Sequence, residues 1–326
     1  MRRQSVLHLI GVIIFVIYFL HPLSTVLVPV LRTILLDIGP YALSKEELAV
    51  PSSQPHNDGA TTIPKIIHQI YLGFDNKEMP PGWEQARQSC IDLHHTYEYR
   101  LWTNESVVDL LRTEYPWFLE TWTHYRYDIQ RADSIRYFIL AQHGGIYVDL
   151  DNGCRRNLDP LLPFQAWMPA TKIQVGLTNH VMGTEKGHPY FQLLIDRIQA
   201  YDYNYVFPYL TVMNSAGPHF VSMVWEEYLR TNTTGDEIRI LMQEEYKDNE
   251  WSFFTKERGG GWYNWDHEVF GWAGQHILLV SVVLLFCICA PTFCLWWIGG
   301  KVAARTRTKD VEKVQSSSLL VWQKSD

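Results

Sequence analysis

The chain has too little basic charge for a nucleic-acid-binding protein. Its 326 residues include 28 Lys and Arg against 35 Asp and Glu, which gives a formal net charge of -7. Proteins that bind phosphate backbones carry an excess of Lys and Arg, so nucleic acid is excluded as a partner. Cysteine is also scarce, with five residues and no Cys/His spacing typical of zinc. An apolar fraction of 47% excludes a disordered chain and indicates a globular protein.

Charged side chains are absent from the segment 276–298, which is long enough to cross a bilayer as a helix. A second, mainly apolar region, 1–38, begins with the basic residues Arg2 and Arg3 and lacks a small-x-small cleavage signal. An uncleaved N-terminal anchor is therefore favoured over a removed signal peptide. Lys and Arg lie at the chain ends of both segments, so the positive-inside tendency places both termini, including the basic tail 299–326, in the cytoplasm.

The region between the two segments is then expected to lie in the secretory lumen. Residues 39–62 are polar and contain Pro, Ser and Asn, which predicts a stem or linker, with a segment packed on the domain as the alternative. A globular domain, large enough to hold an active site, is predicted to follow over 63–270. Sequons at Asn104 and Asn232 agree with a lumenal location, because Asn is glycosylated only in the secretory pathway.

Two of the five cysteines, Cys90 and Cys154, lie in this middle region, and the other three lie in the segment 276–298. Thiols in an oxidising compartment pair when they are close in space. The sequence does not give their distance, so a disulfide and two separate buried thiols both stay open.

Apolar runs and helical periodicity alternate through the domain. Strands are predicted at 63–71, 97–102 and 146–148, and helices at 83–93, 105–115, 117–125, from 131 to Gly144, 191–199 and 219–229. Loops are predicted at 179–183 and 213–218, where Gly, Pro and Asn gather. Alternation of strand and helix predicts an α/β layered domain with a mainly parallel sheet.

The stretch 131–151 carries the chemistry. A helix ending at Gly144 precedes a buried strand that delivers Asp149 and Asp151 at its carboxyl end, where ligands bind in parallel sheets. This Asp-x-Asp supplies the hard anionic oxygens that a divalent cation on a sugar-nucleotide diphosphate requires. A solvated surface turn is the alternative for an isolated triplet.

Asp133 and Arg136 lie three residues apart on the preceding helix. Arg offers a fork of donors and Asp accepts from vicinal hydroxyls, so the pair suits a hexose. A surface ion pair of little energetic consequence is the alternative. Their place just upstream of the Asp-x-Asp favours the functional interpretation.

Five segments together resemble the family 32 glycosyltransferases, the group with a DXD sugar-binding motif. They are IPKIIHQIY from Ile63, LWT from Leu101, EYPWF from Glu114, the stretch from Arg131 to Cys154, and LDPLL from Leu158. Within the family, the similarity is greatest to fungal mannosyltransferases that act on inositol phosphorylceramide. The resemblance implies a GT-A-like nucleotide-sugar-binding domain flanked by transmembrane helices, a location in the Golgi membrane, and transfer with retention of configuration.

The same resemblance implies the cofactor, the partners and the site residues. It implies Mn²⁺ or another divalent cation, GDP-mannose as donor, inositol phosphorylceramide or a related lipid as acceptor, and a regulatory subunit as a candidate partner. The catalytic group that it implies comprises Asp133, Arg136, Asp149 and Asp151, with Asp151 and Asp149 on the metal. Donor contacts are implied for Asp133, Arg136 and Asp149, for Ile70 and Tyr71, which match positions packing on the base, and for Asn179.

The chain departs from the family pattern near the end of the domain. The usual Ser-Ser-Trp-His segment reads Gly260-Gly261-Trp262-Tyr263 here, which leaves Asp266 as the surviving acid and a candidate metal ligand, with His267 nearby. No carboxylate is nominated as a nucleophile. Three functions stay open: mannosyl transfer to inositol phosphorylceramide, hexosyl transfer to a glycan chain or another lipid, and a non-catalytic partner subunit.

Overall fold

The computed structural model divides the chain into two compact units, 1–263 and 264–326. The residues that it describes are 36–49, 62–73, 78–171, 176–231, 237–242, 250–256 and 265–276, with 279–280, 282–283, 286 and 297 beyond them. Among these residues, no helix is both long and apolar enough to cross a membrane. Most of the two predicted membrane segments, and the whole of the predicted cytoplasmic tail, fall outside the described residues.

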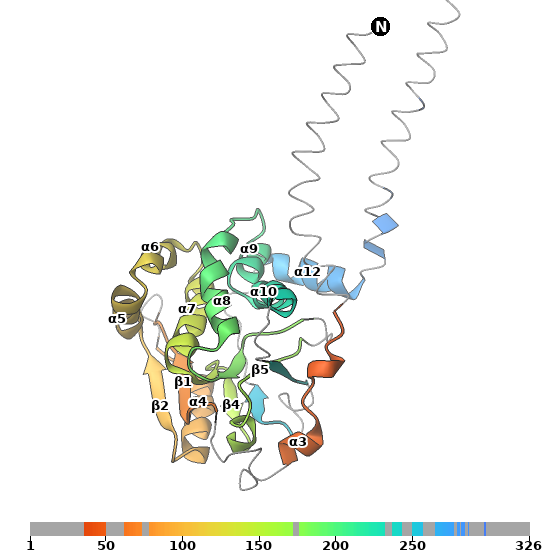
Figure 1. Cartoon of the computed structure of the whole chain (residues 1–326). Coiled ribbons are helices and arrows are strands. Elements are labelled where there is room, and N and C mark those ends of the chain that lie inside the picture. The colour runs from red at the N-terminus through yellow and green to blue at the C-terminus, as the bar shows by residue number, and fades with distance from the viewer. Residues whose placement is uncertain are drawn as a thin grey trace, which may run out of the picture. The chain divides into compact units, whose positions relative to one another are not determined.

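The first unit is built on a mixed β-sheet (Figure 1). Within the described residues it has six strands in the order β2 (Glu98–Trp102), β1 (Ile66–Ile70), β3 (Gly145–Val148), β6 (Val181–Thr184), β5 (Ala166–Pro169) and β7 (Ile238–Leu241). The pairs β1–β2, β1–β3 and β5–β7 are parallel, whereas β6 runs antiparallel to both of its neighbours. The predicted α/β fold with a mainly parallel sheet is therefore confirmed, with one reversed strand near its centre.

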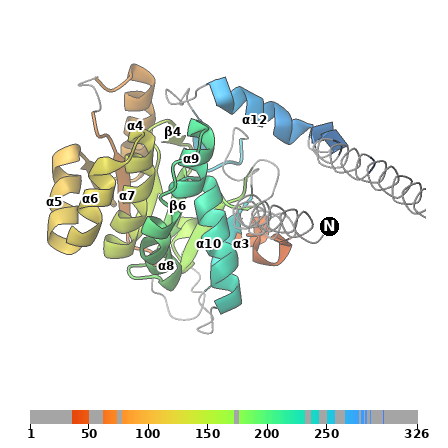
Figure 2. The ribbon, with the colours of Figure 1, turned by 90° about the horizontal axis from the view of Figure 1, so that it is seen from above.

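Helices and a small second sheet complete this unit. The helices are α3 (Lys45–Ala49), α4 (Pro81–Leu93), α5 (Asn104–Glu114), α6 (Pro116–His124), α7 (Asp128–His143), α8 (Pro189–Ile198), α9 (Pro208–Ser215) and α10 (Pro218–Thr231), with short 3-10 turns η2 (Gly39–Tyr41), η4 (Asp159–Leu161) and η5 (Gln199–Tyr201). Strands β4 (Asn152–Cys154) and β8 (Phe254–Lys256) pair antiparallel. Helices α7, α8, α9 and α10 lie next to one another in both views (Figure 1, Figure 2).

Both faces of the central sheet are buried, and strand β3 shows how. Tyr147 joins the apolar cluster formed with α5 to α8 and α10, whereas Ile146 and Val148 join the cluster on the opposite face. Successive side chains of a strand point to opposite faces, so one short strand contributes to both cores. Asp149 follows Tyr147 by two residues, which directs it toward the face that α7 covers.

Two of the predicted loops are wrong in part. Strand β6 begins at Val181, and α9 continues through Ser215. The sequence misleads at Gly183, where glycine predicts a turn. In the fold, a Cβ at Gly183 would overlap the indole of Trp167, so the glycine is needed for close packing between neighbouring strands.

The described part of the predicted stem packs on the domain, which is the alternative that the sequence left open. Leu43 donates its N–H to the carbonyl of Ile240, and Glu47 forms an ion pair of 2.8 Å with Arg239. Leu43 and Leu48 are buried. Ala42 also forms an isolated parallel bridge with Ile240, so the segment 39–49 meets the sheet beside β7 at this one residue.

Candidate functional site

Helix α7 and strand β3 position the centre of the site. The N–H of Gly144 donates to the carbonyl of Leu140 at 2.8 Å, and Gly144 has φ 66°. This left-handed conformation favours glycine and ends the helix, as the sequence predicts. A Cβ there would also lie 2.7 Å from the backbone nitrogen of Lys186. The chain therefore reverses sharply, and β3 brings Asp149 back beside the helix.

Arg136 is the centre of a buried polar cluster. Its Nη2 lies 2.5 Å from Asp133 Oδ1 and its Nη1 lies 3.2 Å from Asp149 Oδ1. Nη1 also donates to the Asn179 carbonyl at 2.7 Å, and the guanidinium lies 4.7 Å from the centroid of the Tyr147 ring. Four of the predicted site residues are thus in one cluster. Only 3% of the Arg136 side chain and 8% of the Asp133 side chain are exposed, so the surface-pair interpretation is wrong.

The electrostatics of this cluster follow from burial and charge. Burial raises the pKa of Asp133 to about 7, against the lowering effect of the Arg136 charge. Burial lowers the pKa of Arg136, but the carboxylates of Asp149 and Asp133 raise it more, so its net shift is upward. Arg136 therefore stays charged while two carboxylates compete for one cation. The cluster holds acceptors and a donor at fixed places, as recognition of sugar hydroxyls requires.

The Asp-x-Asp pair lies at the more exposed side of this cluster. Asp149 accepts a hydrogen bond of 2.6 Å from the Tyr147 hydroxyl. Asp151 accepts from Asn152 Nδ2 at 2.9 Å, and its Oδ2 lies 3.8 Å from Lys256 Nζ. Burial, reinforced by the Asp149 charge, raises the pKa of Asp151 to about 6. Two carboxylates therefore repel each other here, and a cation would relieve that repulsion.

The donor set fits a hard divalent cation that takes part of its coordination from a substrate. No group of three or more His, Cys, Asp or Glu side chains is close enough to hold a metal within the part of the chain that the structure describes. Two carboxylates suffice for Mg²⁺ or Mn²⁺ when substrate phosphates and water complete the shell. Asp266, the third predicted ligand, is the second residue of α12 (Trp265–Gln275) in the unit 264–326, and its role stays a prediction.

Asn179 is fixed by a second hydrogen-bond chain. Its Nδ2 donates to the Tyr137 hydroxyl at 2.8 Å, and that hydroxyl donates to the Ala216 carbonyl at 2.5 Å. The side chain of Gln130 donates to Ser215 Oγ at 2.8 Å. Helix α7 therefore binds the turn between α9 and α10 directly, which places that turn beside the Arg136 cluster.

The predicted base-packing residues reach the same edge of the sheet. β1 and β3 are parallel with His68 opposite Tyr147, so Ile70 is level with Asp149. Ile70 is buried, and the Tyr71 N–H donates to the Trp102 carbonyl at 2.8 Å. Their position agrees with a donor site at this edge, and their contact with a base stays a prediction.

Tyr147 and Lys256 are site residues that the sequence interpretation misses. Tyr147 had a signal, because a residue two positions before Asp149 on the same strand points to the same face. Lys256 had none, since it reaches Asp151 only through the pairing of β8 with β4, where it lies opposite Asn152.

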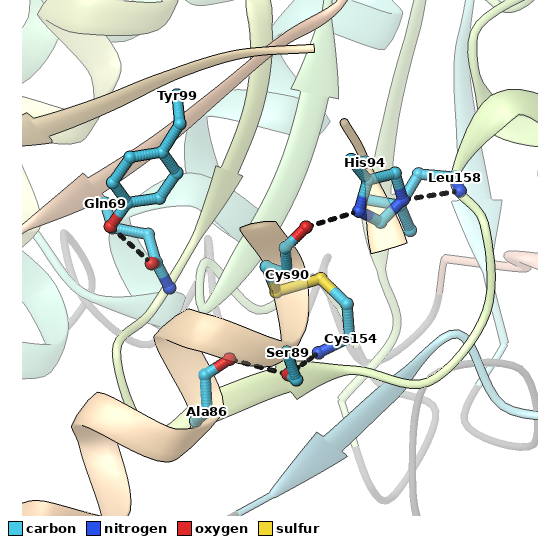
Figure 3. Close-up of a disulfide and its surroundings, with 8 residues drawn as sticks. All are labelled: Gln69, Ala86, Ser89, Cys90, His94, Tyr99, Cys154 and Leu158. Carbon is cyan, nitrogen blue, oxygen red and sulfur yellow. Dashed lines mark hydrogen bonds between the residues drawn. A yellow bond between two sulfur atoms is a disulfide. The ribbon is translucent and has the colours of Figure 1, made fainter. Parts of the chain in front are cut away.

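A disulfide fastens the segment that follows Asp151 (Figure 3). Cys90 of α4 is bonded to Cys154 of β4, which settles the open question about these two thiols. Ser89 Oγ accepts from the Cys154 N–H at 2.9 Å, and His94 Nε2 accepts from the Leu158 N–H at 3.0 Å. α4 and His94, the residue directly after it, therefore hold this segment at Cys154 and at Leu158.

Known proteins resemble the chain over this region. Residues 80–168 match the family described as "Glycosyltransferase sugar-binding region containing DXD motif". Inositol phosphoceramide mannosyltransferase 2 of Schizosaccharomyces pombe is 43% identical over 74% of the chain and 67% of its own length. Mannosyl phosphorylinositol ceramide synthase CSH1 of Saccharomyces cerevisiae is 43% identical over 74% of the chain and 65% of its own length. Inositol phosphoceramide mannosyltransferase 1 of S. pombe is 30% identical over 83% and 82%. The chain thus spans about two thirds of the first two relatives.

Proposed function

The chain belongs to the glycosyltransferases whose sugar-binding region contains a DXD motif, and on that premise we propose that it transfers mannose to inositol phosphorylceramide. The observation that carries sugar transfer is the buried cluster of Asp133, Arg136 and Asp149 at the carboxyl end of β3. The assignment of inositol phosphorylceramide as the acceptor rests on the names of the two relatives that are 43% identical to the chain. The nucleotide-sugar-binding domain has a GT-A-like fold in this proposal.

The donor is GDP-mannose, and the chain's own residues orient it. Asp133 and Arg136 bind the hexose hydroxyls, since a carboxylate accepts from vicinal hydroxyls and a guanidinium donates to them. Asp149 contacts the ribose and sugar while Tyr147 holds its carboxylate in place. Ile70 and Tyr71 pack on the base.

The transfer breaks the bond between the sugar C1 and the β-phosphate oxygen and forms one between C1 and an inositol oxygen, whose proton is released. Mn²⁺ or another divalent cation, held by Asp151 and Asp149, would neutralise charge on the leaving diphosphate. Lys256 adds a positive charge 3.8 Å from Asp151. Cationic groups at the leaving phosphate remove the need for a proton donor there. Configuration is retained, and no nucleophile is assigned.

The catalytic domain lies on the lumenal face of a Golgi membrane, with both termini in the cytoplasm. The Cys90–Cys154 disulfide supports this proposal, because structural disulfides persist in the oxidising secretory pathway. Asn104, the exposed first residue of α5, is available for a glycan. In sealed vesicles, the Asn104 and Asn232 glycans should resist endoglycosidase until detergent is added, and digestion without detergent would invert the topology.

The acceptor is tested by a paired assay. Membranes containing the full chain receive radiolabelled GDP-mannose, Mn²⁺ and either inositol phosphorylceramide or a mannan oligosaccharide. Labelled lipid is the expected product. Labelled oligosaccharide alone would select a glycan acceptor instead. If neither is labelled and loss of the chain lowers the activity of a co-purifying transferase, the chain is a partner or regulatory subunit.

A further inference from the structure

Helix α12, which is labelled in Figure 2, carries apolar side chains in a stripe on its exposed face. Trp265 is 66% exposed, and Val269 and Trp272 are each 51% exposed. These residues are spaced by four and then three positions, so they lie on one face of the helix. Large apolar side chains on a water-facing surface are usually scattered, whereas here they form a line.

The less exposed face of the same helix carries the acidic Asp266, with Phe270 and Ala273 partly buried four and seven positions later. Asp266 is 1% exposed, although it is acidic. A helix on a water-soluble surface buries its apolar side and exposes its polar one. In α12 the two tryptophans and the valine face outward instead. This polarity suits a helix whose outer face lies against an apolar medium.

The apolar character continues past the end of α12. His276 follows directly and stacks on Trp272 with ring centroids 4.7 Å apart. From His276 to Ile298 the sequence contains no Asp, Glu, Lys or Arg. Five large apolar side chains described in that stretch are more than half exposed, whereas Val280 is partly buried: Leu279, Val282, Val283, Phe286 and Trp297. The stripe of α12 thus runs on into chain that is apolar enough to enter lipid.

We propose that α12 is an interfacial helix whose Trp265–Val269–Trp272 stripe lies in the headgroup layer of a lipid bilayer. Its 11 residues extend roughly 16 Å at about 1.5 Å per residue, too short to cross about 30 Å of hydrocarbon. Tryptophan is favoured at the boundary between headgroups and acyl chains because its ring is amphipathic. The helix lies in the plane of the membrane, and the chain enters the bilayer after it.

The proposed attraction between α12 and the bilayer comes from its apolar and aromatic side chains. Helix α12 contains no Lys or Arg, and its exposed face carries Glu268 beside the stripe. Such a helix gains nothing from anionic headgroups, unlike basic amphipathic helices. The bilayer that it fits is therefore zwitterionic, and the contact is insensitive to salt.

The test uses the full chain in nanodiscs of zwitterionic phosphatidylcholine. The emission of Trp272 is obtained as the difference between the unmodified chain and Trp272→Phe. It is measured with lipids brominated near the carbonyl end or near the methyl end of the acyl chain. Bromine quenches a nearby indole, so the carbonyl-end lipid should quench Trp272 more strongly than the methyl-end lipid, and high salt should leave this difference unchanged.

Trp265→Phe gives a second difference spectrum from the same stripe, with the same expected order of quenching. Trp117→Phe is the matched control, because Trp117 is an exposed tryptophan of α6 in the first unit. Its emission should respond to neither lipid. Trp272 emission that neither lipid quenches would overturn the proposal, as would burial of Trp272 against a second copy of the chain. Because these measurements do not involve sugar transfer, their outcome does not depend on the proposed acceptor.

Discussion

The Arg136 guanidinium lies 2.5 Å from the Asp133 carboxylate, three residues earlier on α7, with both side chains almost wholly buried. The same guanidinium reaches Asp149, the residue directly after β3, and the Asn179 carbonyl in the segment before β6. A buried ion pair adds little net stability by itself, because desolvation offsets the attraction. Its value lies in orientation: one side chain fixes the relative positions of three parts of the chain.

Replacing Arg136 should destabilise the fold. In Arg136→Met the buried Asp133 loses its cation, so the free energy of unfolding should fall by about 3–5 kcal/mol. Arg136→Lys keeps the charge but not the fork that serves two carboxylates, and should lose less stability while transfer still falls sharply. Denaturant unfolding in detergent measures the stability of both variants. Arg112→Met is the matched control, since Arg112 and Asp109 form an exposed pair with the same spacing. Its loss should be about 0–1 kcal/mol, and an equal loss in the two variants would contradict the argument.

Asp151→Asn should separate catalysis from folding. The amide keeps the size of the side chain and its acceptor toward Asn152, but it is a poor ligand for a divalent cation. Transfer should fall on the order of 100-fold or more, as when one charge-stabilising group is removed from an active site. The unfolding midpoint should not fall. Asp92→Asn, an exposed change on α4, should leave the rate unchanged. An unaltered rate in Asp151→Asn would remove Asp151 from the metal site.

His68 should make the fold sensitive to acid. Burial lowers the pKa of His68 to about 3, while its Nε2 lies 2.9 Å from the Gly144 carbonyl and its Nδ1 accepts from Trp102. The unfolded chain binds a proton near pH 6.5, so the stabilisation is complete above that pH and is lost as the pH falls toward 3. Between about pH 7 and about pH 5 this residue should account for a loss of about 2 kcal/mol.

His68→Gln retains a donor and an acceptor but does not titrate, so it should lose less stability than the unmodified chain over this range. Urea unfolding at each pH gives the comparison. His95→Gln, an exposed change, should keep the original dependence. Equal pH dependence in His68→Gln and the unmodified chain would mean that His68 is not the residue responsible.

Breaking the disulfide should loosen the segment after Asp151. Cys90 and Cys154 are 64 residues apart, and a loop of this length predicts a loss of about 2–5 kcal/mol when the bond is removed. Cys90→Ser/Cys154→Ser should therefore unfold at a lower temperature in detergent. Reducing agent should lower the midpoint of the unmodified chain to the same value and leave the double variant unchanged. A midpoint that does not respond to reduction would show that the bond does not stabilise the fold.

The sequence alone predicted the elements that carry their own local signals. Helix α7 has apolar residues at helical spacing and a glycine that ends it, and β3 is a short apolar run that releases Asp149. Helices α4, α5, α6, α8 and α10 also agree with their predicted ranges to within a few residues. The disulfide stayed open, because no sequence pattern gives the distance between two thiols.

What the sequence by itself determined was the identity of the acids and of the arginine at the outlet of one strand, since strand period and helix period fix which residues share a face. Only the tertiary structure decided that Asp133 and Arg136 are buried together, that β6 runs antiparallel beside β3, and that Lys256 reaches Asp151. Burial and strand pairing depend on residues far apart in the chain, and their free energies are set by packing and desolvation after those residues meet.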